Sequence, residues 1–282
     1  MASSSKPNPR SNNQKAKRKP LEKRTSSKLT KPYVPPKTKI REDDGLMRLN
    51  RYLAHAGIAS RREADKLIEL GLVTVNGKTI KELGAKVDPK VDVVKYDDRT
   101  LKPEVSRYVL LNKPKDYVTS SEDPMERRTV TMLILSACKE RIYPVGKLDR
   151  NSTGLLLFTN DGDVAKRLLQ PRFGFPKIYH VETVDKVTTA QLAQMREGIK
   201  LEDGYAKAEE AEYVGDGKDQ HSIGVRINSD KSALVRRMFE QLGHKIKKLD
   251  RVMYAGLTKK DLPRGRYRHL TEQEVAFLKM IR

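Results

Sequence analysis

The sequence predicts an α+β protein with two folded regions behind a basic N-terminal tail. Three observations predict this class. Helical periodicity begins abruptly at Met47, many short segments with strand-like alternation follow it, and only a few segments with helical spacing lie among them. Many strands mixed with few helices are typical of α+β domains. We expect a tail over residues 1–46, a small module over 47–105 and a larger domain over 106–282.

The composition points to a polyanionic partner. The 282 residues carry a net charge of +21, which favours nucleic acid or an acidic membrane surface. No run approaches the roughly 18 apolar residues of a membrane span, and the N-terminus lacks the apolar stretch of a secretory signal. The single cysteine, Cys138, cannot form an internal disulfide, and no Cys/His cluster has zinc spacing. We expect a cytoplasmic protein that binds nucleic acid, with no membrane association and no metal.

The N-terminal tail concentrates positive charge. Residues 1–46 contain 13 Lys and Arg against 4 Asp and Glu, with hardly any apolar residues. Such a segment cannot bury enough apolar surface to offset the entropy of ordering it, so we predict that it is disordered. Either a tether for RNA or simply solvated charge would account for it.

The small module is predicted to contain two helices and a hairpin. One helix has an apolar face made by Leu49, Tyr52, Leu53 and Ala56. Ser60 and Glu63 have the spacing of a capping box that opens a second helix. Asn76-Gly77 lies between alternating segments, as in a type I′ hairpin, and another strand is expected around Val91–Lys95.

The run RLNRYLAHAGIASRREADKLIELGLVTVNGK closely resembles the S4-type RNA-binding domain. The resemblance implies that the second helix and the Ser-Arg before it dock on RNA backbone, contacts that orient a protein but specify little sequence. A solvated helix face is the alternative for these charges. The expected RNA-binding residues of this module are Arg48, Arg51, Ser60, Arg61, Arg62, Lys66 and Lys78.

The stretch YPVGKLDRNSTGLLLFTNDGD is the clearest candidate for a site in the larger domain. Asp149 lies between Lys147 and Arg150, which favour its ionised form, and precedes a Ser-Thr-Gly turn. The apolar run Leu155–Phe158 is short enough for a buried strand, and Asp163 can cap a following helix. An acid on a loop between strands suits catalysis, although loop aspartates are more often turn or capping residues.

The run GKLDRNSTGLLLFTNDGD resembles the active-site motif of pseudouridine synthases of the RsuA/RluB type, which modify ribosomal RNA. In that family the Asp of this motif is the catalytic residue, which implies that Asp149 is the nucleophile. The resemblance also implies a bent, mixed but mainly antiparallel sheet with flanking helices and a cleft across it. The family usually has Gly where this chain has Asp116.

Two further segments resemble this family. FPKIYHVET is similar to its K-x-Y-x-V strand, which implies that Tyr179 lies in the active site to stack on the base and help remove a proton. ALVRRMF is similar to its Q-V-R-R-M segment, which implies that Arg236 pairs with Asp149. The chain departs from the family just before this segment, with Asp230-Lys231-Ser232 in place of Gly-(Lys/Arg)-Asn. Beside these residues we expect RNA contacts from Lys147, Arg150, Lys177 and Arg237.

Turning uridine into pseudouridine breaks the N-glycosidic bond and rejoins the base through carbon. A carboxylate suits this step whether it adds covalently or stabilises positive charge on the ribose. It must be ionised, and we expect a buried Asp149 kept charged by Arg236. The base must leave its stack to be reached. No metal, cofactor or nucleotide-binding fingerprint is expected.

The sequence therefore favours an enzyme that isomerises a uridine in ribosomal RNA, in the large subunit before the small, on free RNA or a pre-ribosomal particle. The family suggests a monomer. A non-catalytic RNA-binding or ribosome-assembly factor on the same fold is the alternative. Charge alone also permits a DNA-binding protein, although no recognition-helix pattern is present.

Other elements follow from spacing and caps. We expect a helix-like segment over Met132–Cys138, a helix from Thr188 to Glu197, a helix capped by Asp230, a strand over Lys247–Tyr254 and a terminal helix capped by Thr271 with Glu274.

Overall fold

The computed structural model describes residues 45–120, 128–170, 175–229, 231 and 233–280. Almost all of the tail predicted to be disordered, and the expected helix cap Asp230, lie outside the described residues.

The small module contains the two predicted helices. Helix α1 spans Leu49–His55 and helix α2 spans Arg61–Glu69. Ser60 accepts a hydrogen bond from the backbone of Glu63, and the Glu63 side chain accepts one from the backbone of Ser60, so the predicted capping box is confirmed. The apolar side chains of both helices pack in one core with those of the strands.

The strands of this module form two small sheets. Asn76 and Gly77 both have positive φ, at 50° and 78°, as the predicted type I′ turn requires. The strand expected around Val91–Lys95 lies slightly later, at Val94–Tyr96. One sheet pairs β1 (Met47–Arg48) with β4 (Lys86–Val87), and the other has the order β3 (Lys78–Thr79), β2 (Val73–Val75), β5 (Val94–Tyr96), β6 (Arg99–Thr100).

The larger region is built on a nine-stranded, mainly antiparallel sheet. Its central order is β13 (Glu210–Tyr213), β14 (Ser222–Ile227), β10 (Lys177–Thr183), β15 (Ile246–Tyr254), β9 (Thr153–Thr159), β7 (Tyr108–Lys113), β17 (Tyr267–His269). Strand β8 (Tyr143–Val145) pairs with β9, and β16 (Leu257–Thr258) pairs with β15. Strands β9 and β15 are parallel, whereas the other pairs are antiparallel. The predicted α+β class with a mixed, mainly antiparallel sheet is confirmed.

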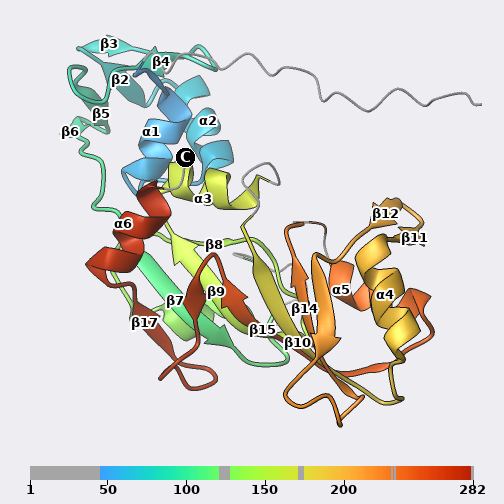
Figure 1. The fold of residues 1–282 in the computed structure, drawn as a ribbon. Helices are drawn as coiled ribbons and strands as arrows, with labels where there is room; N and C mark the ends of the chain where they lie inside the picture. Colours follow the sequence, from blue (N-terminus) through green and yellow to red (C-terminus); the bar gives the residue numbers. More distant parts are fainter. Residues whose placement is uncertain (1–44, 121–127, 171–174, 230, 232, 281–282) are drawn as a thin grey trace, which may run out of the picture. The chain divides into compact units, whose positions relative to one another are not determined.

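Strand β9 is buried on both faces, which explains its unbroken apolar run. Leu155 and Leu157 pack in a core with helices α3 (Gly162–Leu169) and α6 (Glu272–Met280). Leu156 and Phe158 pack in a second core with helices α4 (Thr189–Glu197) and α5 (Leu234–Gln241). Figure 1 shows α3 and α6 beside one part of the sheet and α4 and α5 beside the part that holds β10 and β14.

Two predicted helix starts are confirmed and two differ. Thr188 caps α4 with Gln191, and Thr271 and Glu274 form reciprocal hydrogen bonds at the start of α6. The cap of α3 is Asp161, which accepts from two backbone N–H groups, so the assignment to Asp163 was wrong. Asp161 is placed for this role because β9 ends at Thr159 and the helix begins at Gly162, whereas Asp163 lies inside the first turn. Helix α5 begins after Ala233, three residues later than a cap at Asp230 would put it.

Two further segments differ from the sequence expectation. The apolar segment Met132–Cys138 is not an α-helix, because only a short 3-10 helix, η1, forms over Val130–Ile134. Its apolar residues have no sustained helical period, and Leu135 stays exposed. A hairpin of β11 (Ile199–Leu201) and β12 (Gly204–Ala206), which no pattern indicated, follows α4.

Candidate active site

Asp149 lies on the loop between β8 and β9, and a buried lysine holds that loop. The Lys113 ammonium, at the end of β7, donates to the backbone carbonyls of Pro114, Asp149, Arg150 and Ser152 at 2.7–3.1 Å. Burial lowers the pKa of Lys113 to about 8, although the carboxylates of Asp149 and Asp116 partly offset this effect. Three of its four acceptors belong to the loop, so one side chain sets the path of the backbone that carries the candidate nucleophile.

Neighbouring residues fix the same loop from its other side. The Thr119 hydroxyl donates to the carbonyl of Leu148 at 2.8 Å, and the Leu148 N–H donates back to it at 3.2 Å. The backbone N–H of Asp116 donates to the carbonyl of Arg150 at 3.0 Å. Asp116 has a φ of 68°, in the left-handed region that favours glycine, which agrees with the Gly that the family resemblance implies at this position.

The predicted pairing of Asp149 with Arg236 is present. Arg236 Nε lies 3.2 Å from Asp149 Oδ2, and the Ser152 hydroxyl donates to the same oxygen at 3.3 Å. No described residue donates a hydrogen bond to Asp149 Oδ1, so one carboxylate oxygen stays open to react. The side chains of Asp149 and Arg236 are 29% and 25% exposed, so the expected buried carboxylate is in fact partly exposed. A carboxylate that must touch a substrate has to keep part of its surface accessible.

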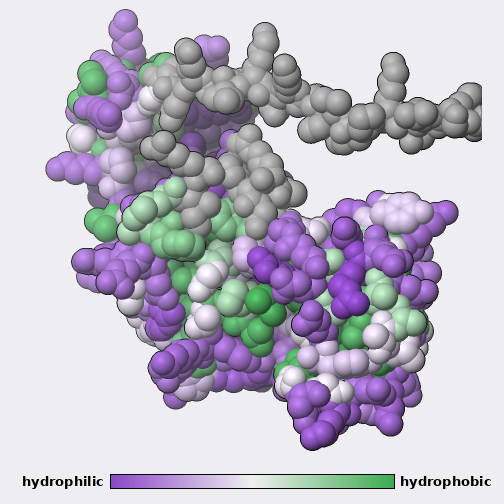
Figure 2. Space-filling view, viewed as in Figure 1, coloured by the Kyte–Doolittle hydropathy of each residue, from purple (hydrophilic) through white to green (hydrophobic). Residues whose placement is uncertain are grey.

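Tyr179 and Asp149 line the same cleft, which has a volume of about 420 Å³, within the size range of small-ligand sites. Tyr179 lies on the central strand β10 and is buried. The apolar side chains of Leu148, Leu234 and Leu249 line the cleft as well. Figure 2 shows one face of the molecule, on which hydrophobic residues gather near the middle with hydrophilic residues around them. The cleft therefore combines an aromatic ring and apolar walls with a reactive carboxylate, an arrangement suited to a flat base.

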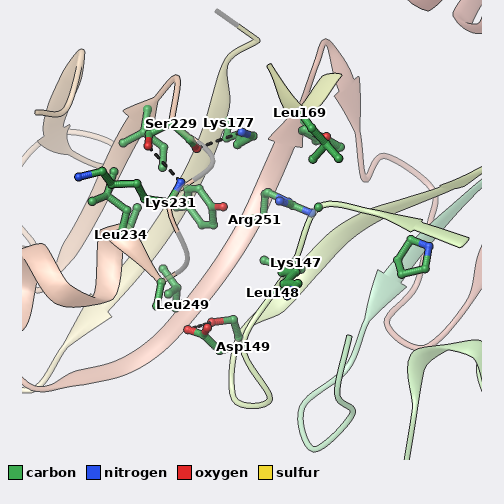
Figure 3. Close-up of a pocket in the computed structure, with 18 residues that line it drawn as sticks. Lys147, Leu148, Asp149, Leu169, Lys177, Ser229, Lys231, Leu234, Leu249 and Arg251 are labelled. Atoms are coloured by element: carbon green, nitrogen blue, oxygen red, sulfur yellow. Dashed lines mark hydrogen bonds between the residues drawn. The ribbon is translucent and has the colours of Figure 1, made fainter. Parts of the chain in front are cut away.

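The other predicted contact residues fall into three groups. Lys147 and Lys177 line the cleft with Asp149 (Figure 3), Lys147 exposed and Lys177 buried. Arg150 and Arg237 do not line it, and form ion pairs with Asp116 and Asp203 at 3.5 Å and 3.0 Å. In the small module Arg51 pairs with Asp163 at 2.7 Å and Ser60 caps α2. The exposed cations of that module are Arg48, Arg61, Arg62, Lys66 and Lys78.

Two residues of the site had no role in the sequence interpretation. Lys113 belongs to the Asn-Lys-Pro segment, but nothing in its spacing shows that a lysine in a buried strand turns back onto a loop 36 residues away. Arg251 lines the cleft from β15, where it stands opposite Tyr179 of β10. Its alternation with Leu249 on an inward-facing strand was the available signal, because a charged residue on such a face needs a special reason.

Within the described part of the chain, no helix has the length and apolar character needed to cross a bilayer. Among those same residues, no group of three or more His, Cys, Asp and Glu side chains is placed to bind a metal ion.

A basic helical module, followed by a cleft with an open carboxylate, an aromatic ring and lysines, defines the class of enzymes that modify a base in nucleic acid. Comparisons with known proteins give the family. The RNA pseudouridylate synthase family model matches residues 107–247, and the S4 domain model matches residues 47–93. The chain belongs to the RNA pseudouridylate synthase family and carries an S4 domain, as its resemblances predicted.

Two relatives and one solved structure each match 82% or 83% of this chain. An uncharacterized RNA pseudouridine synthase of Aquifex aeolicus is 40% identical over 82% of this chain and 93% of its own length. Ribosomal large subunit pseudouridine synthase B of Bacillus subtilis is 38% identical over 83% of this chain and 96% of its own. A crystal structure of a pseudouridylate synthase, 28% identical, superposes with a TM-score of 0.58 over 82% of this chain and 99% of that one.

Proposed function

We propose that this protein isomerises a specific uridine of large-subunit ribosomal RNA to pseudouridine, with Asp149 as nucleophile. The observation that carries the assignment of Asp149 is its carboxylate in the cleft, with one oxygen held by Arg236 and Ser152 and the other open. The choice of ribosomal RNA of the large subunit is supported by two relatives named for that activity, which are 38% and 35% identical to this chain over the matched residues.

The reaction conserves the atoms of its substrate. The Asp149 carboxylate adds to C1′ of the sugar or to the base, the bond between C1′ and N1 breaks, and the uracil turns. C1′ then bonds to C5. The bond to Asp149 breaks in that step for a sugar adduct, or afterwards for a base adduct, and the carboxylate is regenerated. The proton on C5 then leaves, and the base receives a proton at N1. In this scheme Tyr179 supports the turning base through its ring, and its hydroxyl assists removal of the C5 proton. Arg236 keeps the carboxylate charged and in one rotamer.

The remaining assignments follow from this scheme. An isomerisation needs no redox partner or group donor, so we assign no cofactor and no metal. We propose a monomer as the active unit, as the family resemblance suggests. The S4 domain supports a basic module over 47–105 that holds RNA for a catalytic domain over 106–282, with the tail 1–46 as an additional tether. We place the protein in the cytoplasm, acting on ribosomal RNA or a pre-ribosomal particle.

The test is to map pseudouridines in ribosomal RNA from cells with and without this gene. We expect one position of the large-subunit RNA to lose its pseudouridine in the deletion strain. Wild-type protein should restore it, and the Asp149→Asn variant, expressed to the same level, should not. An unchanged map, or restoration by Asp149→Asn, would overturn the proposal and leave an RNA-binding protein without this chemistry.

A further inference from the structure

The end of the cleft away from Asp149 contains two buried cations. Arg251 is 2% exposed and Lys177 is 4% exposed, and both line the cleft. Figure 3 shows Asp149 at one end of the cleft, Lys177 with Ser229 at the other, and Arg251 between them. Arg251 stands opposite Tyr179 in the pairing of β15 with β10, so it is the neighbour of the ring expected to stack on the base.

The guanidinium of Arg251 is held in place, and no anion among the described residues balances its charge. Its Nε donates to the carbonyl of Leu155 at 2.7 Å, and the group lies 4.5 Å from the centre of the Tyr254 ring. Its Nη2 is buried and has no hydrogen-bond partner, and no carboxylate among the described residues forms an ion pair with it. A buried, unpaired cation costs free energy, so its presence in the wall of a substrate cleft points to an anion that arrives with the substrate.

We propose that Arg251 binds a phosphodiester group that flanks the target uridine, and so orients the extruded nucleotide over Tyr179. This inference rests on the proposed function, because it names a contact to the same substrate. A guanidinium presents paired N–H groups that match two phosphate oxygens, and it keeps its charge when buried. The single ring nitrogen or carbonyl of a base would satisfy only one donor and none of the charge.

The rest of the cleft supports a phosphate at this place. Asp149 is the only carboxylate among the described residues that line it, and Arg236 already balances that charge. Lys147 at the rim and Lys177 in the wall add positive charge near Arg251. An extruded nucleotide brings the phosphates on both sides of its sugar toward the cleft, and one of them can reach the residue beside Tyr179.

A binding experiment tests the contact without turnover. Wild-type protein with ¹⁵N-labelled arginine is titrated with uridine, uridine 5′-monophosphate and uridine 3′-monophosphate, and the Arg251 side-chain resonance is assigned with Arg251→Lys. We expect at least one monophosphate to bind about tenfold more tightly than uridine and to shift this resonance. Uridine alone should leave it in place. Equal shifts with uridine and both monophosphates would instead assign Arg251 to the base and overturn the proposal, as would no shift at all.

A second experiment tests the contact in RNA. The RNA carries the mapped uridine, with an uncharged methylphosphonate on its 5′ or its 3′ side. We expect one of the two replacements to raise KM for the wild-type enzyme about tenfold, and the same replacement to have less than about a twofold effect on Arg251→Met. Arg226→Met is the matched control, since it removes an arginine from β14 that pairs with Glu209 and Glu210. It should keep the full wild-type response.

The outcomes separate this inference from the function on which it rests. The phosphate contact would be overturned if the replacement raised KM in Arg251→Met by the same factor as in wild type. It would also be overturned if neither replacement changed KM of the wild-type enzyme. In both cases pseudouridine formation would continue. If wild-type protein formed no pseudouridine, the proposed function would be overturned instead. The titration with monophosphates would still decide whether Arg251 binds phosphate. If Arg251→Met does not fold, the titration and the two replacements on wild-type protein decide it.

Discussion

Two aspartates, one on the loop before β9 and one on the neighbouring strand β15, show how this fold separates catalysis from structure. Asp149 precedes β9 and Asp250 lies on β15, where it pairs with Thr153 of β9. Asp250 is 1% exposed and accepts from Lys259 at 2.6 Å and Arg264 at 3.0 Å. Asp149 is more than a quarter exposed and has one cationic partner at 3.2 Å. Asp250 is therefore a structural acid, buried and paired with two cations. Asp149, the candidate nucleophile, is partly exposed and paired with one.

The difference teaches where the rigidity of the active site comes from. A second cation beside Asp149, like the pair that contacts Oδ2 of the buried Asp250, would hold the carboxylate more firmly but would also cover a group that must reach the substrate. The fold instead holds the backbone of the loop, through the Lys113 ammonium and the Thr119 hydroxyl, and leaves the carboxylate accessible. The position of the catalytic group is thus set by hydrogen bonds to the loop backbone, and the carboxylate itself stays accessible to the substrate.

The largest expected effect is that of Asp149→Asn. Pseudouridine formation should fall by more than about 1,000-fold because the amide is a poor nucleophile, while RNA binding remains. The free energy of unfolding should change by less than about 1 kcal/mol, because the ion pair that is lost is partly exposed. Turnover on a synthetic RNA and denaturant unfolding measure the two effects. Retained activity would remove Asp149 as nucleophile, and a large loss of stability would erase its contrast with Asp250.

Lys113→Met should have the next largest effect. Without the ammonium the loop shifts, and kcat should fall about 100-fold with little change in RNA affinity, since a misplaced reactive group is costly. The pKa of Lys113, lowered to about 8, adds a pH signature. The neutral amine keeps two N–H donors of three, so wild-type kcat should fall as pH rises through about 8.

The residual kcat of Lys113→Met should not fall as pH rises through about 8. If it fell as in wild type, the pH dependence would belong to another group. The free energy of unfolding should rise over the pH range in which kcat falls. Because the pKa of Lys113 is lower in the folded state than in the unfolded chain, burying the charged amine opposes folding below pH 8, and that penalty disappears between about 8 and 10.5.

Asp250→Asn should affect stability and leave chemistry intact. We expect the free energy of unfolding to fall by about 2 kcal/mol, because charge-assisted bonds to Lys259 and Arg264 are weakened, with kcat unchanged. Burial would raise the pKa of Asp250, but these two cations more than offset it and leave the pKa lowered. The carboxylate therefore stabilises the fold above its ordinary pKa near 4, and this stability is lost as pH falls through the lower folded value.

Measuring the melting temperature between pH 2 and 7 checks this contribution. Asp250→Asn should unfold earlier than wild type at pH 7, and the two should converge under acid conditions. A variant with normal stability but impaired kcat would show that Asp250 takes part in the reaction, which would remove the separation between the two aspartates.

The sequence and the structure agree where local signals suffice. The capping boxes at Ser60 and Thr188, the Asn76-Gly77 turn and the apolar run of β9 each depend on a few adjacent residues, and each was predictable. The family motif also indicated the pairing of Asp149 with Arg236, 87 residues apart. The contacts of Lys113 were not predictable, because they arise from strand order and register rather than from spacing. The burial of Arg251 was indicated only by its alternation with Leu249. Likewise the cap at Asp161 differs from Asp163 by two residues, a choice that depends on where the strand ends.

The smallest expected effect concerns the S4 domain, at cations that are exposed to solvent rather than paired with Asp149 or Asp250. Arg61 and Arg62 begin α2 and are exposed, and we expect neither the fold nor the chemical step to depend on them. Arg61→Ala combined with Arg62→Ala should raise KM for RNA by about fivefold to tenfold, lower the salt dependence of binding by about 1 to 2 in logarithmic slope, and leave kcat unchanged. The control is Lys207→Ala with Lys218→Ala, which removes two exposed charges from the other region and should leave KM within about twofold. Fluorescence anisotropy at several salt concentrations and steady-state kinetics measure these effects. If the double variant lowered kcat but not KM, the S4 domain would shape the chemistry rather than hold the RNA.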